Sequence, residues 1–339
     1  MERVENDMLL FLRALRDKCK NNCDAMSGAK PRPPFLGLLS SLKLNSGNYL
    51  TLCHLFKCGV NQNMSKIKPL SFTGNIFNVI DVKKFKESIR LLKESLFDAG
   101  DTLYIADNLI TWNKNYTFLR DPFYIDIIND PNISNVEKSI LWRTYVLMYF
   151  AELSMSVDGD FIECGVLEGT TAFLIDKKLD LGSKDKDFYL FDLFEWNTND
   201  AHDQFPQHFD KNLADRVKQR FISKRHVHVI KGRVPDSFAE KFPDRISFAH
   251  IDMNNEYSEA AALKHIIPLL SPGGSIVLDD YGWWGYSAQK ASLDPIITEY
   301  GLKVLELPTG QGILQKPVVS KNQIQHIDDK NSVVRQAEI

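Results

Sequence analysis

The sequence has no excess of charge of either sign, and this argues against one large class of function. Its 339 residues include 41 Lys and Arg against 44 Asp and Glu, which gives a formal net charge of -3 at pH 7. No long basic run is present. Proteins that bind nucleic acid usually carry such a run or a basic face, because the phosphate backbone dominates affinity. We therefore expect no nucleic-acid partner.

Long hydrophobic runs are also lacking. The most apolar stretch, residues 140–157, is interrupted by Arg143 and Glu152, which is not the pattern of a membrane-spanning helix. Residues 1–7 are acidic rather than basic ahead of the first apolar patch, unlike a secretory signal. We expect no membrane partner and a cytoplasmic location.

Cysteine is scarce and odd in number. Five cysteines in a chain of this length make a disulfide framework an unfavourable interpretation. Cys19 with Cys23 and Cys53 with Cys58 are conceivable zinc ligands, but their spacings differ from the usual CxxC pairs. Reduced thiols are therefore favoured over a zinc site, in agreement with a cytoplasmic location.

The second half of the chain alternates short apolar runs with amphipathic segments, a pattern typical of an α/β doubly wound sheet. Parallel strands need a connection of a dozen or more residues, and the last two runs are separated by only five, so they must form an antiparallel hairpin. The sequence predicts a mostly parallel, Rossmann-like sheet with its last strand reversed. The expected strands cover residues 161–164, 188–192, 227–231, 246–252, 275–279, 303–307 and 313–316.

Carboxylates stand at the ends of these expected strands. Glu163 and Asp192 close the first two strands, and Asp252, Asp279 and Asp280 follow two later ones. In open α/β sheets the ligand crevice lies at the carboxyl ends of the strands, so the later three acids should converge. Three converging carboxylates repel one another unless a cation is present, and hard oxygen ligands favour Mg²⁺ or Ca²⁺. We predict a Mg²⁺ site at these three acids rather than a solvated acidic crevice.

The glycine turn after the first strand lacks the GxGxxG fingerprint of dinucleotide-binding proteins. Gly165 and Gly169 form only GxxxG, and Glu163 just before them would oppose a phosphate and attract a cation. S-adenosylmethionine carries an ammonium group and no phosphate, and Asp192 is placed to accept ribose hydroxyls. This order favours S-adenosylmethionine over NAD. The predicted cofactor-binding residues are Glu163, Gly165, Gly169, Thr170, Thr171, Asp192 and Gly232.

Four segments carry a resemblance to a known family: GDFIECGVLEGTTAFL, FYLFDLFE, HIDMNNEYSEAAALKHIIPLLSPGGSIVLDDYGWWGYSAQKASLD and LPTGQGILQKP. In this order and spacing, residues 158–317 resemble the class I S-adenosylmethionine-dependent methyltransferases, and specifically the macrocin O-methyltransferase family. Members of that family methylate sugar hydroxyls of natural products with the help of magnesium. One departure is that many relatives have DGDLY where this chain has residues 252–256, so that Asn254 replaces the second acid.

The resemblance implies methyl transfer to a sugar hydroxyl of a small-molecule acceptor. Asp252 is the expected proton acceptor, and His250 is the alternative because it lies two residues earlier on the same face of its strand. A nicotinamide oxidoreductase is disfavoured by the missing phosphate turn. A scaffold module without turnover and a catechol methyltransferase stay open as alternatives. The oligomeric state also stays open, a homo-oligomer included.

We expect four parts: an N-terminal helical extension (1–70), a helical region (71–157), the α/β domain (158–317) and a polar tail (318–339). The resemblance implies that the α/β domain is the methyltransferase domain and that the helical region before it covers the active site. Leucines spaced among charges predict an amphipathic helix over 4–20, and three prolines indicate a linker over 27–34. The polar segment 195–210 is interpreted as a lid over the acceptor. Three aromatic residues could form a pocket wall beside the acid pair: Trp283, Trp284 and Tyr286.

Overall fold

The computed structural model describes residues 76–96, 103–195 and 211–318. The chain divides into two units, Met1–Lys66 and Ile67–Ile339, and all described residues belong to the second. The predicted helix over 4–20, the linker over 27–34, four of the five cysteines, nearly all of the lid and nearly all of the tail lie outside the described residues.

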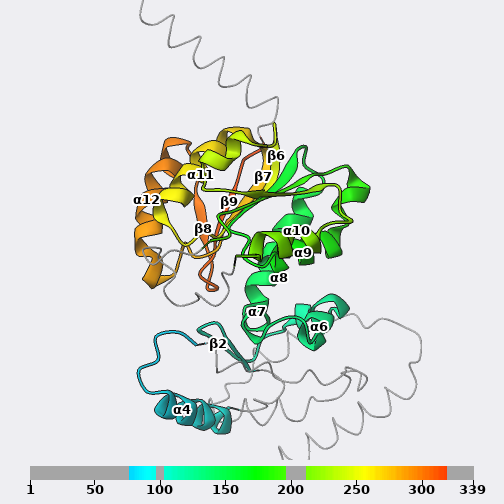
Figure 1. The fold of residues 1–339 in the computed structure, drawn as a ribbon. Helices are drawn as coiled ribbons and strands as arrows, with labels where there is room; N and C mark the ends of the chain where they lie inside the picture. Colours follow the sequence, from blue (N-terminus) through cyan, green and yellow to red (C-terminus); the bar gives the residue numbers. More distant parts are fainter. Residues whose placement is uncertain (1–75, 97–102, 196–210, 319–339) are drawn as a thin grey trace, which may run out of the picture. The chain divides into compact units, whose positions relative to one another are not determined.

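The described part of the chain contains a seven-stranded sheet in the order β5-β4-β3-β6-β7-β9-β8 (Figure 1). Five neighbouring strands run parallel, and β9 is antiparallel to both β7 and β8. The predicted Rossmann-like fold is therefore confirmed, with the reversed strand lying between β7 and β8. The strands are β3 (Asp160–Cys164), β4 (Phe188–Asp192), β5 (Val227–Lys231), β6 (Ile246–Ile251), β7 (Leu270–Leu278), β8 (Val304–Glu306) and β9 (Gly312–Gln315).

Helices cover both faces of this sheet because successive strand residues point to opposite sides. Phe161 packs in one buried cluster with residues of α8, α9 and α10, whereas the next residue, Ile162, packs in a second cluster with α11 and α12. Glu163 therefore shares the face of Phe161, which α8 covers. These helices are α8 (Leu141–Ser154), α9 (Thr170–Leu179), α10 (Leu213–Arg220), α11 (Glu256–Leu269) and α12 (Ser287–Glu299), with short 3-10 turns at Leu181–Lys184, Asp236–Ala239 and Trp284–Tyr286.

The described residues before the sheet form four helices, and they also contain a hairpin that the sequence did not indicate. Asp107 and Asn108 adopt positive φ values of 53° and 55° in the two-residue turn between β1 and β2. Such backbone angles match the tight turns that join antiparallel strands. The elements are α4 (Val82–Ser95), β1 (Tyr104–Ala106), β2 (Leu109–Thr111), a 3-10 turn (Thr117–Arg120), α6 (Pro122–Asn129) and α7 (Asn135–Ser139).

No helix within the described ranges combines the length and the apolar character needed to cross a membrane.

Candidate functional site

Neighbouring strands bring three buried polar side chains to the face covered by α8. Glu163 on β3 lies beside His250 on β6, which in turn lies beside Val277 on β7, two residues before Asp279. The Nδ1 atom of His250 is 2.8 Å from Oε1 of Glu163. Its Nε2 atom is 3.8 Å from Oδ1 of Asp279, an ionic contact longer than a hydrogen bond. The imidazole thus lies between two carboxylates in the interior.

The predicted metal ligands converge. One carboxylate oxygen from each of Asp252, Asp279 and Asp280 lies within 4.8 Å of the other two. Burial and the charges of Asp279 and Asp280 raise the pKa of Asp252 well above its usual value. Burial and the charge of Asp279 also raise the pKa of Asp280 to about 6. Three oxygen donors that disfavour one another's ionisation fit a hard divalent cation such as Mg²⁺.

A buried arginine, which the sequence did not point to, contacts two of these acids. The Nη1 atom of Arg143, on α8, donates to Oδ2 of Asp279 at 2.5 Å and to Oδ1 of Asp280 at 2.9 Å. Its Nε and Nη2 atoms donate to the two oxygens of Asp107 at 2.7 and 3.2 Å. Burial opposes the ionisation of Asp279, but Arg143 and His250 outweigh it and lower the pKa of this carboxyl.

The turn between β8 and β9 completes the surroundings of Asp279. Gln311 is fully buried, and its Nε2 atom donates to Oδ1 of Asp279 at 3.0 Å and to the backbone oxygen of Arg143 at 3.4 Å. Thr309 donates to the side-chain oxygen of Gln311. Both oxygens of Asp279 therefore accept hydrogen bonds from side chains that lie far from it in the sequence.

The loop after β6 is shaped by Glu259, a second residue that sequence reasoning missed. Its Oε1 atom accepts the backbone N–H groups of Met253 and Asn254 at 3.1 and 3.0 Å, and it also accepts a hydrogen bond from Gln289. Burial raises the pKa of Glu259 to about 8. Asn254, the amide at the position of the family's second acid, lies with Nδ2 3.4 Å from Oδ1 of Asp252. Here the amide donates towards Asp252 instead of adding another charge.

The cofactor residues predicted from the sequence lie at the carboxyl ends of β3, β4 and β5. Gly165 follows β3, Gly169 is the N-cap of α9, and Gly232 follows β5. Thr170 and Thr171 are the first two residues of α9. Of these three glycines, Gly165 has the least space for a side chain, because a Cβ atom built there would lie 1.8 Å from the backbone oxygen of Asp252.

Asp192 fastens the glycine turn to β4. Its Oδ2 atom accepts the backbone N–H groups of Val166 and Leu167 at 2.6 and 2.8 Å, and its Oδ1 atom accepts that of Phe194 at 2.6 Å. A carboxylate offers about four acceptor positions, so ribose hydroxyls can still be accepted. The sequence placed Asp192 near a ribose, and the structure adds this main-chain role.

The aromatic residues after the acid pair differ in their surroundings. The ring centroid of Trp283 lies 4.9 Å from the Arg143 guanidinium and 5.6 Å from that of Phe77. Tyr286 is half-buried, and its pKa is raised to about 12 by burial and by the charges of Asp280 and Asp252. Trp284 is 90% exposed. Trp283 and Tyr286 thus adjoin the acids, whereas Trp284 faces solvent.

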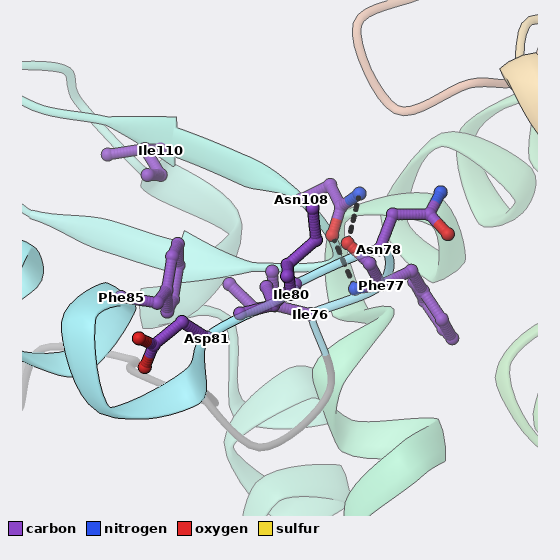
Figure 2. Close-up of a pocket in the computed structure, with 9 residues that line it drawn as sticks. Ile76, Phe77, Asn78, Ile80, Asp81, Phe85, Asn108 and Ile110 are labelled. Atoms are coloured by element: carbon purple, nitrogen blue, oxygen red, sulfur yellow. Dashed lines mark hydrogen bonds between the residues drawn. The ribbon is translucent and has the colours of Figure 1, made fainter.

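A cavity of about 480 Å³ lies beside the β1–β2 hairpin (Figure 2). Asn108 exchanges hydrogen bonds with the backbone of Phe77, joining the hairpin to the segment before α4. Apolar side chains supply much of the remaining wall, including Ile76, Ile80, Phe85 and Ile110. Phe77 also contacts Trp283, so the cavity and the acid site share neighbouring residues.

Residues 162–281 match a family model described as a methyltransferase domain. The matched range runs from β3 to just beyond the acid pair and includes Glu163, Asp192, Asp252, Asp279 and Asp280. This part of the chain is a methyltransferase domain, and the protein is an enzyme of the methyltransferase class. No curated protein matches the sequence.

Solved structures are similar to parts of this chain at low sequence identity. The O-methyltransferase NovP is 16% identical, with a TM-score of 0.45, and the match covers 55% of this chain and 82% of NovP. CalS11, a TDP-rhamnose 3'-O-methyltransferase of calicheamicin biosynthesis, is 15% identical, with a TM-score of 0.41 and coverage of 57% and 90%. The SAH-bound Podospora anserina methyltransferase PaMTH1 is 11% identical, with a TM-score of 0.39 and coverage of 70% and 96%.

Replacing Asp192 by alanine is expected to weaken S-adenosylmethionine binding. The substitution leaves three backbone N–H groups without their acceptor and loosens the glycine turn. The ribose hydroxyls that Asp192 is predicted to accept would also lose their acceptor, at about 1 to 3 kcal/mol, or about 5- to 150-fold in Kd. Titration calorimetry measures this directly, with Asp187→Ala, before the other end of β4, as the control. Unchanged affinity in folded Asp192→Ala would remove this residue from the cofactor site.

Proposed function

We propose that this enzyme transfers a methyl group from S-adenosylmethionine to a sugar hydroxyl of a small-molecule acceptor, with Mg²⁺ as an aid. The observation that carries the proposal is the convergence of Asp252, Asp279 and Asp280 at the ends of β6 and β7 within a methyltransferase domain. A hydroxyl is a poor nucleophile while it is protonated. A group of carboxylates that binds a cation, next to the predicted cofactor residues, would help to remove that proton and so suits methyl transfer to oxygen.

Glu163 supports the assignment of the cofactor. Within the described residues, its Oε2 atom is buried and has no hydrogen-bond partner, while Oε1 is held by His250. A buried acceptor without a partner is costly, and an ammonium group such as that of the methionyl end would satisfy it. When bound, S-adenosylmethionine supplies an electrophilic methyl group on a sulfonium. Glu163 would orient its amino acid end, while Asp192 and the turn that Asp192 fastens would hold the ribose.

Asp252 is the better candidate for the proton acceptor. Although burial disfavours the charged ring, interactions with Asp279 and Glu163 raise the pKa of His250 to about 10. The imidazole is therefore protonated at neutral pH and has no free electron pair for the acceptor's proton. The raised pKa of Asp252 belongs to the cation-free site, and a bound divalent cation would favour its carboxylate form, which can accept the proton of the hydroxyl. We assign His250 the task of holding Glu163 in place.

Asp252, Asp279 and Asp280 would hold the Mg²⁺ ion, which when bound lowers the pKa of a coordinated hydroxyl and fixes its orientation. Gln311 donates a hydrogen bond to Oδ1 of Asp279 and holds that oxygen in one position, whereas Arg143 contacts the other oxygen, Oδ2.

The resemblance to the macrocin O-methyltransferase family supports a sugar acceptor. We propose that the segment before β3 covers the acceptor. A panel of glycosides, nucleotide sugars and catechols, incubated with labelled S-adenosylmethionine, tests this assignment. Turnover with catechols alone would contradict the sugar acceptor and leave methyl transfer intact.

Chelation of divalent cations is expected to abolish turnover while S-adenosylmethionine binding persists. The acids that would hold the cation are distinct from Glu163 and Asp192, which would hold the cofactor. EDTA followed by an excess of Mg²⁺ should remove and restore turnover, and calorimetry should give a similar cofactor Kd throughout. The variant Asp280→Asn should behave like the chelated protein. Full turnover in excess EDTA would contradict the role of the metal.

A further inference from the structure

The guanidinium of Arg143 lies between two sets of carboxylates. One side, Nε and Nη2, faces both oxygens of Asp107, and the other, Nη1, faces Asp279 and Asp280. Arg143 and Asp107 are 8% and 4% exposed, so solvent screens these contacts little. Trp283 lies against the same guanidinium. The buried guanidinium of Arg143 thus contacts both the β1–β2 turn and two of the acids proposed to bind the metal.

The oxygens that Arg143 contacts belong to the proposed ligand carboxylates. Oδ2 of Asp279 and Oδ1 of Asp280 accept from Arg143, while the other oxygen of Asp279 accepts from Gln311. Mg²⁺ requires oxygens at about 2.0 to 2.1 Å in a nearly octahedral arrangement. A guanidinium on the same oxygens repels the incoming ion and occupies directions that the ion needs.

We propose that Arg143 is an internal competitor of the divalent cation. In the cation-free protein, Arg143 neutralises Asp279 and Asp280. Cation binding transfers these carboxylates from Arg143 to the ion, and Arg143 keeps its contact with Asp107. The inference rests on the proposed cation site.

Asp107 makes this exchange possible. Its two oxygens receive two N–H groups of Arg143, the bidentate geometry that suits guanidinium and carboxylate. The tight turn of the hairpin fixes its backbone. After the cation enters, Arg143 retains one charged partner, and the large cost of a buried, unpaired charge is avoided. Asp107 and the cation therefore cooperate: each favours the arrangement in which Arg143 leaves Asp279 and Asp280.

Two substitutions are expected to shift cation affinity in opposite directions. Arg143→Met removes the competing charge and should lower the Kd for Mn²⁺ at least tenfold. Asp107→Asn removes the alternative partner, so Arg143 binds Asp279 and Asp280 more strongly, and the Kd should rise at least fivefold. Mn²⁺ is a suitable probe because it accepts octahedral oxygen ligands and its free form is measured by electron paramagnetic resonance. The full chain is titrated at pH 7 without cofactor or acceptor.

General damage to the fold would weaken Mn²⁺ binding in both variants, so the opposite signs are diagnostic. The double variant Arg143→Met/Asp107→Asn lacks both the guanidinium of Arg143 and the carboxylate of Asp107. It should bind Mn²⁺ as tightly as Arg143→Met, and it can be measured even if Arg143→Met alone fails to fold. Arg245→Met, at an exposed ion pair, should match the unaltered protein. Equal or weaker binding by the folded arginine variants, or tighter binding by Asp107→Asn, would overturn the proposal. Absence of Mn²⁺ binding in every protein would overturn both it and the cation site, whereas calorimetry with S-adenosylmethionine tests the methyltransferase assignment separately.

Discussion

Replacing Asp252 by asparagine is expected to lower turnover by about 10² to 10⁴-fold, the usual contribution of a positioned general base. Asparagine keeps the shape of the side chain but has no basic oxygen for the acceptor's proton and is a weaker cation ligand. Turnover is measured with labelled S-adenosylmethionine and the best acceptor of the panel. The exposed Asp236→Asn serves as the control. A folded Asp252→Asn enzyme with full turnover would exclude Asp252 as the base.

The same substitution is expected to stabilise the cation-free protein. The pKa of Asp252 is raised in the folded state, so between its unfolded value near pH ~4 and its folded value the native protein binds more protons than the unfolded chain. Stability of the unaltered protein therefore falls as pH rises through this window. The variant lacks this penalty, so its gain in Tm should be larger at pH 8 than at pH 5. Scanning calorimetry in EDTA measures both, and an equal gain at the two pH values would contradict the raised pKa.

Replacing Gly165 by alanine is expected to have the largest effect on stability among the substitutions considered. The new Cβ atom would lie 1.8 Å from the backbone oxygen of Asp252, and the φ angle of +92° is unfavourable for any residue with a Cβ. The strands must therefore separate, at a cost of about 3 kcal/mol or more in the free energy of unfolding. Urea unfolding followed by circular dichroism measures this loss.

Two other glycines provide matched controls for Gly165→Ala. Gly285 has open space around it and no positive φ, so Gly285→Ala should change stability by about 0.5 kcal/mol or less. Gly301 has a φ of +66° but also open space, so Gly301→Ala isolates the backbone strain, about 1 kcal/mol. If Gly165→Ala were no more destabilising than Gly301→Ala, the contact with the Asp252 backbone would not constrain this position.

The sheet could be predicted from the sequence because its strands are buried on both faces and bounded by polar or glycine-containing turns. The short link between the last two strands was enough to give the direction of β9. The meeting of Asp252, Asp279 and Asp280 at one edge of the sheet could also be predicted, because parallel strands place their carboxyl ends together. These features depend on local pattern and on general rules of sheet topology.

The partners of these acids could not be predicted in the same way. Arg143 lies 136 residues from Asp279 and 36 from Asp107, and no periodicity links them. Its one signal in the sequence is a charge within an apolar helix, and that charge by itself argues only against a membrane span. The hairpin that carries Asp107 has strands of three residues, too short for a visible alternation. Tertiary contacts alone determine these pairings.

The position of Gln311 in the chain has a consequence for biosynthesis. Translation proceeds from the N-terminus, so the two strands that carry Glu163 and Asp192 and the two that directly precede Asp252 and Asp279 have all been made before the β8–β9 turn leaves the ribosome. Until then, Oδ1 of Asp279 lacks its amide donor, and β7 has an open edge where β9 later pairs. The nascent domain therefore acquires its ordered acid centre in one of its final folding steps, and ribosome-bound chains that stop before Gln311 should bind the divalent cation poorly even after the parallel core has formed.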